Sequence, residues 1–115
     1  MSGLTPYRIL MFAFGFSLGT TVAQAADWTV FNNCMRGYLA PVDAAEPSIL
    51  SGATLIVRVL CVEESANLAN ALVSENPNAV RDHGSYGEAF SSFLTVMERD
   101  TALELFQVRR SKLEH

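Results

Sequence analysis

The fold depends on residues 54–73, which read TLIVRVLCVEESANLANALV and could form one helix or a strand followed by a helix. The opening TLIVRVLCV is rich in β-branched side chains, which are typical of a buried strand. The remaining EESANLANALV has the composition of a helix. No glycine, proline or asparagine separates the two parts, and a strand cannot pass into a helix without a turn. We therefore predict one continuous helix.

This predicted helix extends beyond the stretch in both directions. Pro47 suits its first position, where the missing N–H costs nothing, and the turn signal ENPN follows Ser74. Gly52 counts slightly against a helix, by about 1 kcal/mol relative to alanine. The apolar stripe comprises Leu50, Ala53, Val57, Leu60, Cys61, Leu68 and Leu72. Since residues 55–62 are apolar on nearly every side, we expect this helix to lie at the centre of the domain.

Another helix is expected in DWTVFNNCMRGYLA, residues 27–40. Asp27 or Thr29 could cap its start, and Pro41 should end it, because the residue before a proline is displaced from helical geometry. The apolar side chains that recur at steps of three and four are Trp28, Phe31, Met35, Tyr38 and Leu39.

A third helix should begin at SYGE, where Ser85 and Glu88 have the spacing of a capping box. Asp100 could cap a separate fourth helix. The apolar stripe comprises Ala89, Phe90, Phe93, Leu94, Met97, Thr101, Leu105 and Val108. The sequence therefore predicts an all-α fold, a small bundle of three to four helices.

Both termini carry segments that we set apart from the fold. ILMFAFGFSL is an apolar core of ten residues, and AQA before Ala26 is the small-x-small pattern that signal peptidase accepts. The alternative is an uncleaved anchor, although a helix needs about 20 apolar residues to cross a bilayer. The final LEH matches vector-derived residues that precede a polyhistidine tag. We expect a signal peptide at 1–25, a single periplasmic or secreted helical domain at 26–112, and a tag remnant at 113–115.

The two cysteines, Cys34 and Cys61, each fall on the apolar face of a predicted helix, and export would place them in an oxidising compartment. We predict an interhelical disulfide, which in the chain-entropy model stabilises by roughly 3–4 kcal/mol. It requires residues 41–46 to run back along the second helix, because Cys34 lies about 9 Å from its helix end and Cys61 about 21 Å from its own. Two buried thiols and redox chemistry are the alternatives.

Charge and motif content limit the possible functions. Residues 26–115 contain seven basic and twelve acidic side chains, for a net charge of −5, which argues against binding nucleic acid or anionic lipid. His83 is the one histidine before the terminal His115, so a zinc site is not expected. Asp82, His83 and Ser85 are too close in sequence to converge into a catalytic triad. We expect no enzymatic activity and no cofactor.

The motifs CMRGY, EP and CVEE, found after a signal peptide, resemble those of short exported bacterial proteins in which two cysteines staple the first two helices of a small helical domain. The build of the chain is also similar to that of periplasmic immunity proteins that neutralise secreted cell-wall amidases. The resemblance implies a non-catalytic domain that binds a periplasmic or secreted protein, as an inhibitor or immunity protein for a cell-wall-directed enzyme. The alternatives are an envelope accessory protein, or a small-molecule binder. The latter would use a pocket among Trp28, Phe31, Phe90 and Phe93.

Two places are candidates for contact with a partner. Residues 77–88 have no apolar periodicity and are expected to form a loop, in which Arg81, His83 and Tyr86 could contact the partner. The alternative is a mobile connector whose Tyr86 packs on the start of the third helix. Arg58 either bridges to a carboxylate such as Glu98 or Asp100, or anchors a partner.

Overall fold

The computed structural model describes residues 26–114, and the expected signal segment and His115 lie outside the described residues. The described part is helical, with no strand. Its elements are α1 (Trp28–Ala45), α2 (Ile49–Leu55), the π-helical η1 (Ile56–Leu60), α3 (Val62–Glu75), α4 (Pro77–His83) and α5 (Tyr86–Leu113). The all-α prediction is confirmed, but in these residues five α-helices replace the expected three to four.

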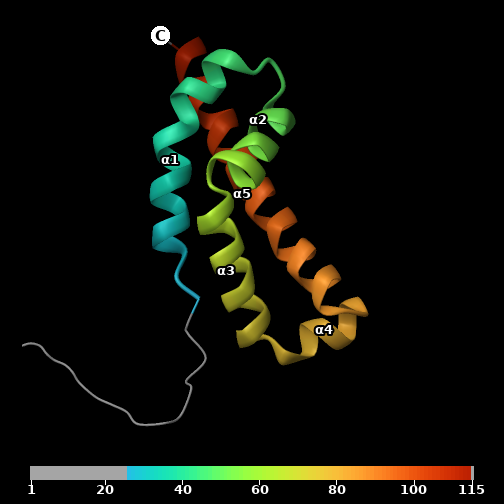
Figure 1. Cartoon of the computed structure of the whole chain (residues 1–115). Coiled ribbons are helices and arrows are strands. Elements are labelled where there is room, and N and C mark those ends of the chain that lie inside the picture. The colour runs from blue at the N-terminus through green and yellow to red at the C-terminus, as the bar shows by residue number, and fades with distance from the viewer. Residues whose placement is uncertain (1–25, 115) are drawn as a thin grey trace, which may run out of the picture.

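The chain runs up along α1, back down through α2, η1 and α3, and up again along α5, which contacts every other element (Figure 1). The fully buried side chains at the centre of these three passes include Phe31, Met35, Ile56, Val57, Cys61, Met97 and Leu105. Most of the predicted apolar stripes therefore form the core. Leu50 and Tyr38 are errors of that prediction, because they are 74% and 38% exposed.

The middle pass is helical throughout but is not the continuous α-helix that the sequence predicts. Residues 56–60 form a π-helical turn, and the backbone of Cys61 leaves helical geometry, with φ −117° and ψ 35°. The N–H of Cys61 donates to the carbonyl of Ile56 at 2.7 Å, five residues back. The wider turn buries Cys61 while Val59 and Val62 remain 60% and 53% exposed, so this segment is covered on fewer sides than expected.

Pro41 does not end the first helix, contrary to the prediction from sequence. α1 continues one turn further to Ala45, even though an interior proline costs about 3 kcal/mol. The additional turn buries Val42 and brings Asp43 into ion pairs with α5, and these tertiary contacts offset the local cost. Ser48, not Pro47, then begins the second helix, because its side chain accepts a hydrogen bond from the N–H of Ser51.

The longer α1 changes how the cysteines meet. About 17 Å of helix now separates Cys34 from Ala45, which matches the length from Ile49 to Cys61. The two cysteines are therefore level across a tight turn, and no segment has to run back along the second helix. Their Sγ atoms lie 2.08 Å apart, at disulfide distance, with the Cα atoms 6.1 Å apart.

Gly52 explains why α2 can approach its neighbours so closely. A Cβ at this position would lie 3.0 Å from Cγ1 of Val42 and 3.1 Å from Cδ1 of Leu105. The glycine that counts against a helix in the sequence is thus required by packing against α1 and α5.

The third pass begins as predicted and continues without a break. The side chain of Ser85 accepts a hydrogen bond from the N–H of Glu88 and caps α5. α5 then runs for 28 residues, so the prediction that Asp100 starts a fourth helix is wrong. Asp100 is exposed, while its neighbour Thr101 is fully buried and bonded to the carbonyl of Met97, which keeps this part of α5 packed on the core.

Candidate functional site

The expected loop at residues 77–88 is instead a short helix followed by the start of α5. Pro77 occupies the first turn of α4, and Gly84, with φ of 95°, ends it in a left-handed conformation that glycine adopts without strain. Arg81 and His83 lie on α4, and the guanidinium of Arg81 donates to the Asn78 side chain at 2.9 Å. The prediction of a loop was wrong because seven residues with no buried side chain leave no periodic apolar signal.

Tyr86 packs on the start of α5, which is the alternative that the sequence allowed. Its ring stacks on that of Phe90, with centroids 6.4 Å apart, and its hydroxyl donates to the side-chain oxygen of Asn70 on α3. The residue is still 48% exposed. Tyr86 therefore joins α5 to α3 and also borders the surface that Asn70 helps to form.

Arg58 lies elsewhere on the molecule and does not join this group. It forms an ion pair with Glu98 of α5, which confirms the predicted bridge to a carboxylate. Glu98 lies about 18 Å along the α5 axis from Tyr86. The structure thus brings Arg81, His83 and Tyr86 to one corner and separates Arg58 from them.

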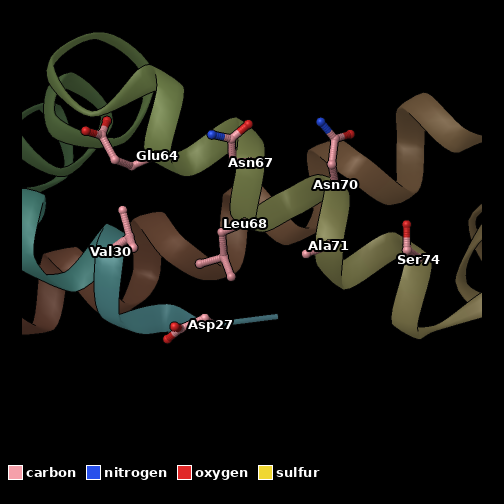
Figure 2. A pocket seen from close by; sticks show the side chains of 8 residues that line it. All are labelled: Asp27, Val30, Glu64, Asn67, Leu68, Asn70, Ala71 and Ser74. Carbon is pink, nitrogen blue, oxygen red and sulfur yellow. The ribbon is translucent and has the colours of Figure 1, made fainter. Parts of the chain in front are cut away.

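A groove lies between the start of α1 and one face of α3, whose Asn70 is the hydrogen-bond partner of Tyr86. Its volume is about 550 Å³, and Figure 2 shows its walls. The lining residues are Asp27 and Val30 from the α1 side, and Glu64, Asn67, Leu68, Asn70, Ala71 and Ser74 from α3. Because Ala71 and Ser74 are small, the two helices leave open space between them.

Local sequence positions the acidic walls of the groove. Asp27 caps α1, and the hydrogen bond from the backbone N–H of Thr29 at 2.9 Å holds the pKa of the Asp27 carboxyl below its ordinary value. Glu64 lies in the first turn of α3, where a negative charge complements the helix dipole. The Asp27 carboxyl is therefore ionised at neutral pH.

The groove offers acceptors and adaptable donors, and the described residues bring no positive charge to it. Ionised carboxylates only accept hydrogen bonds, whereas the amides of Asn67 and Asn70 both donate and accept. Among residues 26–114, no lysine, arginine or histidine lines the groove. Such walls suit a guanidinium or ammonium group carried by a peptide segment.

Glu64 also lies beside the cysteines. One carboxylate oxygen of Glu64 and the sulfurs of Cys34 and Cys61 all lie within 4.8 Å of one another. Thiolates are the usual soft metal ligands, and at disulfide distance the two sulfurs are not available as thiolates. Glu64 is therefore a neighbour of a disulfide, and these three side chains do not offer the thiolate ligands of a metal site.

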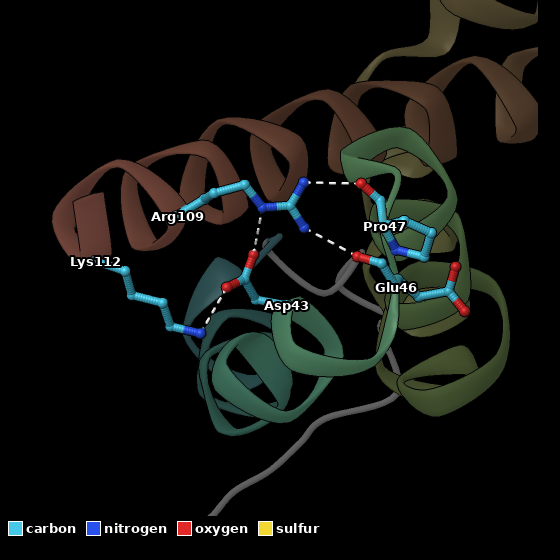
Figure 3. A network of polar contacts seen from close by, with 5 residues as sticks. All are labelled: Asp43, Glu46, Pro47, Arg109 and Lys112. Atoms are coloured by element: carbon cyan, nitrogen blue, oxygen red, sulfur yellow. Dashed lines mark hydrogen bonds and ion pairs between the residues drawn. The ribbon is translucent and has the colours of Figure 1, made fainter.

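A polar network of a different kind links the end of α5 to the turn between α1 and α2 (Figure 3). The Asp43 carboxylate accepts from Lys112 at 2.8 Å and from Arg109 at 2.9 Å. Arg109 also donates to the backbone carbonyls of Glu46 and Pro47, both at 2.9 Å. The hydrogen bond from Lys112, aided by Arg109 and opposed by burial, lowers the pKa of Asp43. This clamp holds the turn in place.

Sequence reasoning missed both the clamp and the groove. The clamp was missed because the first helix was predicted to end at Pro41, which placed Asp43 in a loop and gave no reason to pair it with α5. The groove residues do carry a signal, because Glu64, Asn67, Ala71 and Ser74 recur at steps of three and four on α3. The sequence shows this pattern of small and polar side chains on α3, but it does not show that the start of α1 lies opposite them.

Among residues 26–114, no helix combines the length and the apolar character needed to cross a membrane. Comparisons of the chain with protein-family models, with characterised proteins and with solved structures found no match.

Proposed function

We propose that this chain is an exported, non-catalytic protein-binding domain whose α1–α3 groove receives a basic segment of a periplasmic or secreted partner. The observation that carries the proposal is the groove itself, to which the described residues bring the carboxylates of Asp27 and Glu64, two amides and no basic side chain. Charge complementarity of this kind steers encounter and selects the partner. The excess of twelve acidic over seven basic side chains in residues 26–115 acts in the same direction.

The partner class that we propose is a cell-wall-directed enzyme, with this chain as its inhibitor or immunity protein. Support comes from the resemblance to exported, acidic, stapled helical domains, and from Tyr86, whose hydroxyl bonds to Asn70 in the wall of the groove. Tyr86 is exposed enough to contact a partner while Asn70 and Phe90 hold it in position. A preorganised aromatic side chain loses little entropy on binding.

The small-molecule alternative receives no support from the four aromatic residues on which it depended. Phe31 is fully buried, and Trp28 meets it edge-on with ring centroids 6.3 Å apart. Phe90 and Phe93 pack against the same core. Phe31 therefore belongs to the interior, and the other three are partly buried side chains packed against the core.

The proposal is tested by capture from a periplasmic extract of the source organism. The mature protein is immobilised beside a groove variant, Glu64→Gln with Asn67→Ala, and retained proteins are identified by mass spectrometry. The matched control is Glu104→Gln with Gln107→Ala, which makes the same kinds of change at the same spacing on α5, outside the groove.

The groove account predicts a protein that the parent and the control retain and that the groove variant binds at least about tenfold more weakly, the loss of about one hot spot. Capture should also weaken as salt is raised, since exposed charge pairs are screened. Equal retention by all three forms would contradict the groove as the binding surface. Alanine at Arg81, His83 and Tyr86 then tests whether the adjoining corner belongs to the same interface.

A further inference from the structure

We propose that cleavage between Ala25 and Ala26 creates an α-amino group for which Glu75 is the built-in receptor. The backbone nitrogen of Ala26 donates to the carboxylate of Glu75, 49 residues away in sequence. Ala26 is also half-buried and packs against the core. The proposal rests on the exported location in the proposed function, but not on the groove or on any partner.

Cleavage changes the chemical nature of the donor in this contact, the nitrogen of Ala26. Hydrolysis by a signal peptidase consumes one water, leaves a carboxylate on Ala25, and leaves a protonated amine on Ala26 at neutral pH. A neutral amide N–H then becomes a cation, so the hydrogen bond to the Glu75 carboxylate becomes an ion pair as well. The AQA sequence before Ala26 places the cut at the residue whose nitrogen already faces Glu75.

The surroundings of Glu75 favour a cation. It is the last residue of α3, where the helix dipole is negative and a carboxylate without a cation is disfavoured. α1 contributes Asp27 beside Ala26, and α4 contributes Asp82 and His83 to the hollow that Glu75 lines. Phe93 of α5 also lines this hollow and carries no charge. Acidic side chains thus outnumber basic ones around Glu75.

The consequence is that processing converts a hydrogen bond at the start of α1 into an ion pair. The new amine ties the start of α1 to the end of α3, two helices that also contact each other directly. Asp27, the next residue, caps α1 and also lines the groove. Processing therefore fixes one end of the groove as well as removing the signal segment.

The first measurement is the intact mass of the exported protein, which gives its first residue. The proposal requires a chain that begins at Ala26. Any other first residue overturns it, because the amino group would then not stand at the nitrogen that meets Glu75.

The second measurement is the pKa of the Ala26 amino group, followed by the NMR shift of its labelled methyl carbon across pH. In the parent the value should lie above about 7.7–8.0, the usual range for an unpaired α-amino group, by about 0.5 or more. Glu75→Gln should return it to that range. Glu63→Gln, which removes an exposed carboxylate at the other end of α3, should leave the raised value unchanged. The same pKa in the parent and in Glu75→Gln overturns the pairing.

The pH dependence of stability gives an independent readout. A group whose pKa is raised in the folded state stabilises fully below its unfolded pKa, and this contribution is lost as pH rises through the folded pKa. The parent should therefore melt above Glu75→Gln at pH 7, and the gap should close by about pH 10. A chain that retains Gln24 and Ala25 lacks the amine at Ala26 and should show a smaller gap. A gap that is constant with pH would contradict the proposal, whatever the outcome at the groove.

Discussion

At the end of the bundle where α1 turns into α2, the Asp43 carboxylate is 3% exposed and bonded to both Arg109 and Lys112. In the other half, the carboxylates of Asp27 and Glu64 line a groove to which residues 26–114 contribute no basic side chain. Asp43 is thus neutralised within the fold by Arg109 and Lys112, whereas Asp27 and Glu64 face a groove that is open to solvent. Buried charges that are paired hold a structure together, while carboxylates that no basic side chain neutralises are available for an external cation.

The largest effect should come from the cysteines that join α1 to the middle pass between these halves. Cys61→Ser, or reduction of the parent, should lower the free energy of unfolding by about 3.5 kcal/mol, since the bond closes a loop of 27 residues. Denaturant unfolding of the mature domain measures it. Intact mass with alkylation and without reductant is the control, and two alkylatable thiols in exported protein would contradict the bond.

The clamp should give the next largest effect. Asp43→Asn should destabilise by about 2 kcal/mol, below the 3–5 kcal/mol typical of a fully buried pair, because Arg109 and Lys112 remain 33% and 56% exposed. Denaturant unfolding at neutral pH measures the loss. Glu114→Gln is the control, because it removes only an exposed pair with Arg110 and should change stability by about 0.5 kcal/mol or less.

The clamp also predicts a pH dependence with a definite sign. The pKa of Asp43 is lowered, so its stabilisation is present above the unfolded pKa and is lost as pH falls through the folded value. The stability gap between the parent and Asp43→Asn should therefore be constant near neutrality and shrink below about pH 4. A gap that widens in acid would contradict the ion pairs with Arg109 and Lys112.

Two helical glycines, Gly37 and Gly52, should give smaller changes in stability, of opposite sign. A Cβ at Gly37 would meet no neighbouring side chain of the described residues within 4 Å, so Gly37→Ala should stabilise by about 0.5–1 kcal/mol through helix propensity alone. Gly52→Ala should instead destabilise by about 1–2 kcal/mol, because its methyl group would press on Val42 and Leu105 in the core. Thermal unfolding of both variants measures the difference, and equal stabilisation would show that α2 is not closely packed.

Periodicity was sufficient to predict the core and not the breaks in the helices. Phe31, Met35, Val57 and Met97 were placed correctly because burial of apolar side chains repeats at the helical period. Pro41 was misjudged because a local rule for ending helices yields when tertiary contacts such as those of Val42 offset its cost.

The π-helical turn and the groove could not be predicted from the sequence, because both depend on contacts between segments that are distant along the chain. Nothing in IVRVL distinguishes a π-helical turn from an α-helical one, since the register shift serves the contact between Cys61 and Cys34. The groove needs Asp27 to face α3, and a contact across the bundle leaves no mark in local sequence.

The central claim is that Asp43 serves the fold and that Glu64 is available for binding. The most direct test is the free energy of unfolding of Glu64→Gln beside that of Asp43→Asn, each measured against the parent at neutral pH. The account predicts a loss of about 2 kcal/mol for Asp43→Asn and of about 0.5 kcal/mol or less for Glu64→Gln, whose helix-dipole contribution Glu63 still supplies. Equal losses in the two variants would contradict it, because Glu64 would then be as structural as Asp43.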